Sequence, residues 1–329
     1  MKNNGFLNLL LGTYTFFSLG SVQAQDASKQ YPSRPIRIIA PTSPGGANDM
    51  LPRLLSPKLI ANLGQQIVVD VRPGAGGIVG TELAAKAMPD GYTLVVIANG
   101  YALNPYIYDK LPYDTMKDLE RVTLFAAAPL VLVVHPSLGV SSLSELTSVL
   151  KARPGQINYA SSGAGSGGWL SAQLYRRMAG VEMAHIPYKG AGQATTAVVS
   201  GEVNLLFTSP LPASPHIKSG RLRALGVTSE KRITSLEGVP AMGESMPGYE
   251  VINFFGVLAP GGTPKPIVAK LHREIARVTS QADMHERFES LGYQVVDKNP
   301  EQFTQFIKSE MTKWSKVFVD IGIKPTSFH

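Results

Sequence analysis

Residues 158–175 of the chain read NYASSGAGSGGWLSAQLY. The pattern predicts a strand at Ile157–Ala160, a Gly/Ser turn at Ser161–Gly168, and a helix that starts at Trp169. Such a turn leaves backbone N–H groups free at the N-terminus of a helix, where the positive end of the helix dipole favours an anion. We therefore predict an anion-binding turn; the alternative is a turn that only connects the strand to the helix.

The same order of strand, turn and helix occurs near the N-terminus. Ile36–Ala40 is rich in β-branched residues, as strands are, and the turn PTSPGGANDM at 41–50 follows it. Leucines at helical spacing come next, and Asn48 or Asp49 suits the N-cap of this helix. Pro57 fits a helix interior poorly, so the helix either kinks there or starts later.

Strand and helix patterns alternate along the rest of the chain, and several strands are unbroken apolar runs, as expected where helices cover both faces of a sheet. Expected strands are Ile36–Ala40, Ile67–Val71, Tyr92–Ala98, Leu130–His135, Ile157–Ala160, Glu182–Ile186, Leu205–Thr208, Ala224–Val227 and Phe255–Ala259. Expected helices are Thr81–Ala87, Ser142–Ala152, Trp169–Ala179, Gln193–Ser200, Pro212–Ser219, Pro266–Thr279, Asp283–Leu291 and Pro300–Ile321. The alternation predicts an α/β protein with mainly parallel sheets flanked by helices.

The composition limits the classes of function. The chain has 329 residues, 44% hydrophobic and 17% charged, which suits two domains with packed cores. It has no cysteine, which excludes disulfides, thiolate metal sites and cysteine nucleophiles. The histidines lack metal-binding spacing, so we expect no metal and no cofactor. The net charge of +7 favours anionic ligands, but the basic residues are scattered without a nucleic-acid-binding pattern, so no nucleic-acid partner is expected.

Residues 1–24 have the pattern of a signal peptide. Lys2 supplies a positive charge, Phe6–Leu19 is mostly apolar, and Val22-Gln23-Ala24 has the form of a cleavage site. The apolar run is too short and too polar for a membrane span, and no later run is long enough. We therefore expect export, cleavage after Ala24, and a mature protein that is not inserted in the membrane.

Motifs spread over most of the mature chain resemble, in order and spacing, the Bug family of periplasmic receptors for tripartite tricarboxylate transporters. They are RPGAGG at 72–77, PDGYTL at 89–94, PYKG at 187–190 and APGGTP at 259–264. The resemblance implies a two-lobed, type II periplasmic-binding-protein fold, the Venus flytrap. It places lobe one at residues 25–129 and 253–329, lobe two at residues 130–252, and a ligand cleft between them.

The resemblance also implies a function. The protein would be a non-enzymatic monomer in the periplasm that binds a small carboxylate and delivers it to the membrane subunits of a transporter, similar to TctA and TctB. Ligand contacts from lobe one would be Ser43, Gly45, Gly46, Asn48, Asp49, Gly76, Gly77, Val79 and Asn99. Contacts from lobe two would be Ser161, Ser162, Gly163, Ser166, Trp169, Tyr188, Lys189, Gly190, Thr208 and Ser209. For Asp49 we favour a structural role in its loop over a bond to an ammonium or hydroxyl group of the ligand.

Two positions depart from the pattern of the family. Trp169-Leu170 stands where many relatives have a His-Leu pair, and Thr208 and Ser209 stand where many have an acidic residue. These changes favour a flat or apolar carboxylate, because an indole offers a stacking face. The alternative is that Trp169 packs beneath the turn.

Three other functions remain as alternatives. Gly163, Gly165 and Gly168 fit G-x-G-x-x-G, and Glu182 lies near the offset of a ribose-binding acid, as in a dinucleotide-dependent oxidoreductase. AGSGG at 164–168 is one residue from the nucleophile elbow of a hydrolase, in which Ser166 would need a histidine and an acid. The six histidines carry no signature for that role, so we expect them at the surface or in packing. An orphan sensory receptor of the same fold is the third alternative.

Overall fold

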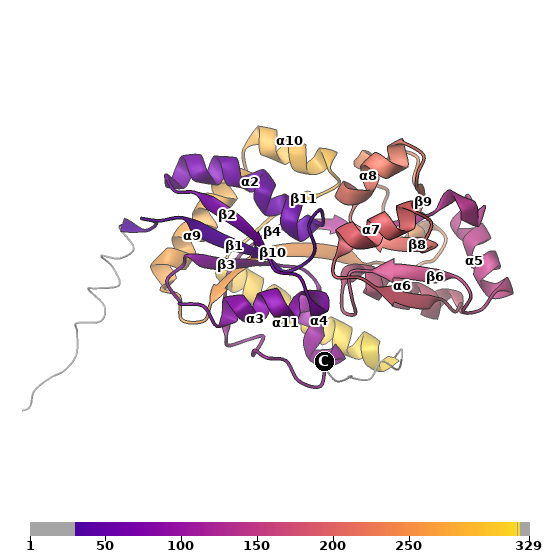
Figure 1. The fold of residues 1–329 in the computed structure, drawn as a ribbon, viewed down its shortest axis with the longest axis horizontal. Coiled ribbons are helices and arrows are strands. Elements are labelled where there is room, and N and C mark those ends of the chain that lie inside the picture. The colour runs from indigo at the N-terminus through magenta and orange to yellow at the C-terminus, as the bar shows by residue number, and fades with distance from the viewer. Residues whose placement is uncertain (1–29, 321, 323–329) are drawn as a thin grey trace, which may run out of the picture.

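The computed structural model describes residues 30–320 and residue 322, and it has two lobes, each built on one β-sheet with helices on its faces (Figure 1). The first sheet contains β1 (Ile36–Ala40), β2 (Ile67–Val71), β3 (Thr93–Ile97), β4 (Leu119–Pro129), β10 (Ile252–Pro260) and β11 (Gln294–Lys298). Its lobe holds the helices α2 (Ala47–Leu63), α3 (Ile78–Ala85), α4 (Gly100–Ile107), α9 (Lys265–Thr279), α10 (Ala282–Ser290) and α11 (Pro300–Asp320). The predicted signal peptide lies outside the described residues.

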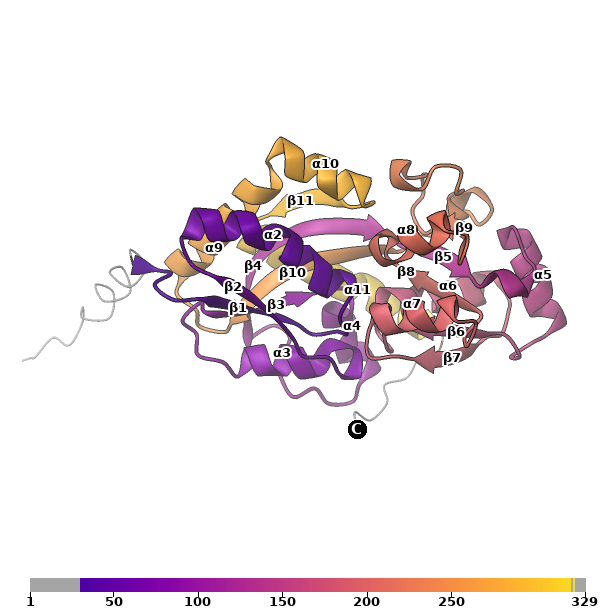
Figure 2. The ribbon, with the colours of Figure 1, turned by 45° about the horizontal axis from the view of Figure 1, so that its top comes forward.

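The second sheet contains β5 (Val131–Val134), β6 (Asn158–Ser161), β7 (Ala184–Pro187), β8 (Leu205–Thr208) and β9 (Arg223–Val227). Its lobe holds α5 (Leu143–Ala152), α6 (Gly167–Ala179), α7 (Ala191–Val199) and α8 (Pro210–Lys218), and Figure 2 shows the two lobes side by side. Within the described part of the chain, no helix combines the length and the apolar character that a membrane span needs.

The α/β two-lobed fold is confirmed, but the prediction of mainly parallel sheets is wrong, since both sheets are mixed. The first sheet has the order β11-β4-β10-β3-β1-β2, in which β1 is parallel to β2 and β3, whereas β10 is antiparallel to β3 and β4. The second sheet has the order β7-β6-β8-β5-β9, in which β5 is antiparallel to both of its neighbours. The strands next to the crossings are antiparallel, because β10 returns from the other lobe and enters its sheet in the opposite direction. The edge strand β11 is also antiparallel to its neighbour β4.

The two crossings between the lobes lie side by side and are tied together by Thr228. The chain leaves the first sheet at the end of β4, passes Leu130 and enters the second sheet as β5; it returns through Val251 into β10. The hydroxyl of Thr228 accepts from Leu130 N (2.8 Å) and donates to the carbonyl of Val251 (2.5 Å). β4 ends at Pro129 and β10 begins at Ile252. The lobe boundaries at residues 129/130 and 252/253 stay a prediction.

Helix α11 connects the cores of both lobes. Its first half places Phe303 and Ile307 in the core beneath the first sheet. Its second half places Trp314 and Phe318 in the core of the other lobe, where Phe318 meets Trp169 edge-on at 5.9 Å between ring centres. Figure 1 shows α11 in yellow, extending from the first lobe towards the second. This helix therefore connects the two lobes in addition to the crossing strands.

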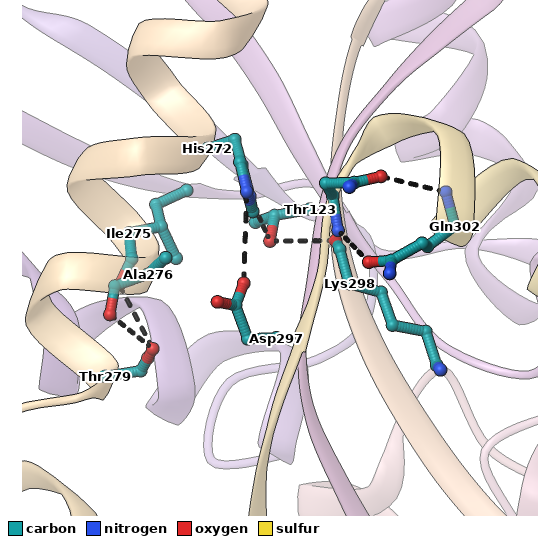
Figure 3. A network of polar contacts seen from close by, with 9 residues as sticks. Thr123, His272, Ile275, Ala276, Thr279, Asp297, Lys298 and Gln302 are labelled. Carbon is teal, nitrogen blue, oxygen red and sulfur yellow. Dashed lines mark hydrogen bonds and ion pairs between the residues drawn. The ribbon is translucent and has the colours of Figure 1, made fainter.

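A polar network fixes α9 and β11 to β4 (Figure 3). Thr123 Oγ1 donates to the carbonyl of Lys298 at 3.3 Å and lies 3.1 Å from His272 Nδ1. On its other side the His272 ring lies 3.9 Å from a carboxylate oxygen of Asp297. His272 thus has the packing role expected for it, while His329 lies outside the described residues.

The start of α2 differs from the prediction. The helix begins at Ala47 with Gly46 as its N-cap, which offers no side-chain bond, so Asn48 and Asp49 lie inside the first turn. The helix does not start later: it runs without interruption from Ala47 to Leu63 and contains both Pro52 and Pro57. Each proline removes only one backbone donor, and packing of Leu51, Leu55 and Leu59 in the core compensates for that loss.

Candidate functional site

A cavity lies between the lobes, at the ends of β1, β6 and β8 and beside the returning strand β10. Its volume is about 70 Å³. Its walls are formed by Pro41, Thr42, Gly46, Ala47, Asn48, Gly76, Gly77, Thr81, Ile97, Ala98, Gly100, Tyr101, Asn104, Leu130, Ser162, Ser166, Gly167, Gly168, Ala191, Leu206, Phe207, Thr208, Ser209, Asn253 and Phe255. None of these side chains is charged, so the site depends on dipoles and neutral hydrogen-bonding groups.

Two helices, one from each lobe, begin at this cavity. Ala47 and Asn48 start α2, and Gly167 and Gly168 start α6, and all four line the wall. The first amides of a helix have no acceptor within it, and the positive end of its dipole lies there. In α6 the third amide, of Trp169, is capped by Ser166 Oγ at 3.2 Å, which leaves the amides of the two glycines for a ligand. This arrangement favours an anion such as a carboxylate.

Side-chain polar atoms without partners gather around the same cavity. Such atoms are rare in folded proteins, because burying a polar group without a hydrogen bond costs free energy. Four cavity-lining residues contribute one each: Asn48 Oδ1, Asn104 Oδ1, Thr208 Oγ1 and Asn253 Oδ1. Ser43 Oγ, in the turn after β1, is a fifth. Their concentration at one place indicates that a ligand completes their hydrogen bonds.

The structure brings only part of the predicted contact set to this cavity. The predicted residues that line it are Gly46, Asn48, Gly76, Gly77, Ser162, Ser166, Thr208 and Ser209. The predicted residues outside its lining are Ser43, Gly45, Asp49, Val79, Asn99, Ser161, Gly163, Trp169, Tyr188, Lys189 and Gly190. That the second group contacts a ligand stays a prediction. Several of its members form hydrogen bonds or packing contacts within the protein.

Ser161 and His185 together hold the Gly/Ser turn. Ser161 is fully buried, and its hydroxyl accepts from Gly163 N at 3.0 Å and lies 2.7 Å from His185 Nε2. The His185 ring stacks on Tyr159 with 4.8 Å between ring centres. Burial, with a smaller effect from Arg176, lowers the pKa of His185 to about 4. The ring is therefore neutral at pH 7 and can accept a hydrogen bond from the Ser161 hydroxyl.

Asp49 and Asn99 also have partners within the protein. One carboxylate oxygen of Asp49 accepts from Gly45 N at 3.1 Å, and the other accepts from Arg53 Nε at 2.7 Å. Asp49 therefore has a structural role in its loop, the role that the sequence analysis favours. It acts from the first turn of α2 and not as the N-cap. Asn99 binds the returning strand β10 through both amide atoms, donating to Ile252 O at 2.9 Å and accepting from Phe254 N at 3.1 Å.

Trp169 and Tyr188 point to surroundings other than the cavity. Trp169 is 7% exposed and packs on Phe318, which is the packing alternative for this residue. The Tyr188 hydroxyl donates to Glu202 at 2.8 Å, and burial together with that carboxylate raises the pKa of Tyr188 to about 12. It lines a separate, more open hollow of about 780 Å³, formed by α7, α8 and residues Pro44, Gly45 and Met50 of the other lobe.

Two contacts between backbones hold the lobes against each other, one on each side of the cavity. The first, called here the outer contact, joins residues 43–46 to residues 189–192, and Ser43 N donates to Lys189 O at 3.1 Å. A Cβ added at Gly192 would collide with the carbonyl oxygen of Pro44. The second joins Gly76 to Gly163, where a Cβ on Gly163 would lie 3.2 Å from Gly76 Cα. Glycine is required at these positions because the two main chains touch.

Sequence reasoning missed several cavity residues, above all Asn104, Tyr101 and Asn253. Asn104 and Tyr101 belong to α4, whose glycine and proline hide its helical pattern. Asn253 lies on the crossing strand, where the sequence suggested only a lobe boundary. The one available signal was a lone polar residue, Asn253, within the apolar run of β10.

The features required by the enzyme alternatives do not come together. Glu182 is an exposed partner of Arg176 at 2.6 Å and does not line the cavity, so the G-x-G-x-x-G turn lacks its ribose-binding acid. Across residues 30–320, no hydrogen bond joins Ser166 to a histidine; its hydroxyl caps α6. The same residues contain no group of three or more metal-binding side chains that could hold an ion.

A two-lobed α/β fold with a cavity between its lobes, here uncharged and bordered by helix N-termini, is typical of periplasmic binding proteins. The sequence model of the family described as "Tripartite tricarboxylate transporter family receptor" matches residues 51–323. The chain belongs to this family, whose members are periplasmic receptors.

Curated relatives and solved structures agree with this assignment. Protein BugT of Bordetella pertussis is 36% identical over 316 residues, covering 94% of this chain and 96% of BugT. A UPF0065 protein of Pseudomonas sp. (strain P51) is 36% identical over 322 residues, covering 97% and 96% of the two chains.

Among solved structures, R. palustris Rpa4515 with adipate is 32% identical with a TM-score of 0.88, covering 90% of this chain and all of that one. MatC from Rhodopseudomonas palustris, with bound malate, is 31% identical with a TM-score of 0.82, covering 87% and 99%. The structure of the periplasmic binding protein BugD is 30% identical with a TM-score of 0.87, covering 90% and 100%.

Proposed function

We propose that this protein binds one small carboxylate in the cavity between its lobes and delivers it to a membrane transporter of the tripartite tricarboxylate type. The observation that carries the proposal is the meeting of two helix N-termini, one from each lobe, at a cavity ringed by unpartnered polar atoms. The adipate and malate bound to similar proteins support a carboxylate as the ligand.

Binding would work by closure of the lobes. A carboxylate that accepts from the first amides of α6 and also reaches those of α2 makes its full set of bonds only when both lobes enclose it. The ligand therefore binds the closed form more tightly than the open form and shifts the population towards it. A transporter that recognises the closed form would then receive only loaded receptors.

The shape of the ligand follows from the position of Trp169. The expectation of an aromatic acid depended on its indole as a stacking face, but the indole packs on Phe318 in the core. We therefore propose an aliphatic acid. Aromatic acids belong in the test, and tight binding of benzoate alone would restore the earlier expectation.

Export and partners complete the proposal. The mature protein would begin at Gln25, act as a monomer in the periplasm, and meet the membrane subunits similar to TctA and TctB. N-terminal sequencing of the periplasmic fraction tests the cleavage site. A sensory role predicts that deleting the gene alters a transcriptional response while uptake of the acid is unchanged; the transport role predicts loss of uptake.

A thermal-unfolding panel tests the central function. The mature protein is heated with citrate, succinate, malate, aspartate, glutamate, nicotinate, benzoate and phthalate, with NAD and a p-nitrophenyl ester as controls for the enzyme alternatives. A ligand at one hundred times its Kd adds about 2.7 kcal/mol to the free energy of unfolding, which raises Tm by several degrees. A shift with a subset of the acids is the expected result. A shift only with NAD, or turnover of the ester, would contradict it.

A further inference from the structure

We infer that Asn99 is a positioning residue of the binding site, which acts on the ligand through Asn253 and makes no contact with the ligand itself. The inference rests on the proposed function and specifies how lobe one presents one wall of the same cavity. It starts from an asparagine at the N-cap of a helix that its side chain does not cap.

The side chain of Asn99 is free of the task that its position predicts. An asparagine at an N-cap usually accepts a hydrogen bond from the first turn of its own helix. Here α4 has no side-chain cap, and only the backbone carbonyl of Asn99 accepts from the helix, from Ala102 N at 3.0 Å and Leu103 N at 3.2 Å. Asn99 is 1% exposed, so its amide group needs partners within the protein. It finds both of them on β10.

The amide group of Asn99 takes the place of a strand residue beside β10. β3 pairs with β10 up to its own last residue, and the chain then turns into α4. A side-chain amide carries the same donor and acceptor as a peptide group, so it can continue the pairing. Asn99 Nδ2 donates to Ile252 O at 2.9 Å, and Asn99 Oδ1 accepts from Phe254 N at 3.1 Å. The two bonds lie on either side of Asn253 and therefore fix the backbone that carries it.

Asn253 meets both the cavity and the other lobe. It lines the cavity, and its side-chain oxygen Oδ1 is buried without a partner. A Cβ on Gly167 would lie 2.7 Å from this oxygen, so the side chain packs against the first turn of α6, which borders the cavity. A side-chain amide can also donate to a carboxylate. A shift of β10 at this residue would move Asn253 away from the turn and the ligand, and Asn99 prevents that shift.

A double-variant cycle tests the inference by calorimetric titration with the acid that raises Tm most in the thermal panel. Asn253→Ala and Asn99→Ala are each expected to weaken binding at least about fivefold, the factor of one ordinary hydrogen bond. Because Asn99 acts through Asn253, the double variant should bind within about twofold of Asn253→Ala. Two factors that multiply would overturn the inference, since Asn99 would then act by another route. Unchanged affinity in either single variant would overturn it as well.

Asn204→Ala is the matched control for a general loss of stability. Asn204 Oδ1 also accepts from a backbone amide, Asn158 N at 3.0 Å, but it lies in lobe two and outside the cavity lining. This variant should lower Tm and bind the acid within about twofold of the wild type. If it weakens binding as much as Asn99→Ala does, the loss follows stability and the positioning role is refuted.

Hydrogen exchange of the Phe254 amide tests the hold on β10 without any ligand. The Phe254 amide should exchange at least about tenfold faster in Asn99→Ala than in the wild type, and Asn253→Ala should leave it slow. Unchanged exchange in Asn99→Ala would overturn the inference. Should that variant not fold, Asn99→Ser, which offers one hydroxyl in place of the amide, replaces it in both experiments. If no acid of the panel binds the wild-type protein, the proposed function fails, a result distinct from a change in exchange.

Discussion

Several side chains next to the cavity hold the binding loops and lie outside the cavity lining. Asp49 is the clearest case, since its buried carboxylate bonds Gly45 N and Arg53 Nε. Asp49→Ala is expected to lower the free energy of unfolding by about 1–2 kcal/mol, because Gly45 N loses a charged acceptor. Urea denaturation measures the loss. Lys86→Ala, which breaks an exposed pair with Glu82, is the control and should cost about 0.5 kcal/mol or less; equal losses would contradict the role of Asp49.

His185 makes stability depend on pH in a defined direction. Its pKa is about 4 in the folded protein, below its ordinary value of 6.5, chiefly because of burial. Between these values the unfolded chain binds a proton that the folded chain does not. The contribution of neutral His185 to the free energy of unfolding is therefore complete above pH 6.5 and is lost as the pH falls towards 4. The loss is about 2–3 kcal/mol at pH 4.5.

Urea denaturation from pH 7.5 to 4.5, compared between the wild type and His185→Gln, isolates this group because the acidic residues titrate alike in both. The glutamine keeps a neutral polar group beside Ser161 but cannot titrate. The difference between the two free energies should fall with decreasing pH. Parallel curves would show that His185 is not buried in the neutral form.

At the scale of elements, the cap of α6 serves both folding and binding. Ser166 Oγ accepts from Trp169 N at 3.2 Å and thereby sets the first turn whose amides face the cavity. Ser166→Ala should cost about 1 kcal/mol in stability, as for other N-caps, and should weaken malate binding about tenfold. Ser142→Ala removes a matching cap from α5, where Ser142 Oγ accepts from Glu145 N at 3.2 Å, far from the cavity in sequence and outside its lining.

The paired variants separate the two effects of the cap. Thermal unfolding should show similar losses for both, whereas calorimetry should show weaker binding only for Ser166→Ala. Unchanged affinity in Ser166→Ala would move the carboxylate away from α6. Weaker binding in both would mean that the loss follows global stability.

The elements differ in how well the sequence predicts them. β1, β2 and β8 agree residue for residue with the prediction, because each is a short run of mostly β-branched or apolar residues. β4 was missed: its LERVTLFAAAP mixes charges with three alanines, and it is stabilised by pairing with β10, which is far away in sequence. The antiparallel direction of β10 was missed for a related reason, since local alternation does not show that the chain returns from another lobe.

The site shows the same division between local and long-range information. The turns at 41–46 and 161–168 could be predicted, because glycine, serine and a following helix are adjacent in the sequence. The packing of Trp169 on Phe318 and the place of Asn253 in the wall could not, because each depends on segments that only the folded chain brings together. Motifs located the cleft, but they did not separate residues that line it from residues that support it.

At the scale of the whole molecule, the backbones of the two lobes touch at the outer contact, and we expect this contact to limit how far the lobes close. Gly192→Ala introduces a methyl group against Pro44 O, so the lobes should close less completely. Malate affinity should fall at least about tenfold, and small-angle scattering of the malate complex should give a larger radius of gyration than the wild type. Gly243→Ala is the control, because an added Cβ there meets nothing closer than 3.6 Å. Wild-type affinity in Gly192→Ala would show that closure at this contact is not needed for binding.

A crystal structure of the mature protein with malate tests the central claim most directly. The account predicts one malate in the cavity between the lobes, with a carboxylate against the first amides of α6 and α2. Malate bound elsewhere, such as in the hollow beside Tyr188, or with its carboxylates directed away from both helices, would contradict the account.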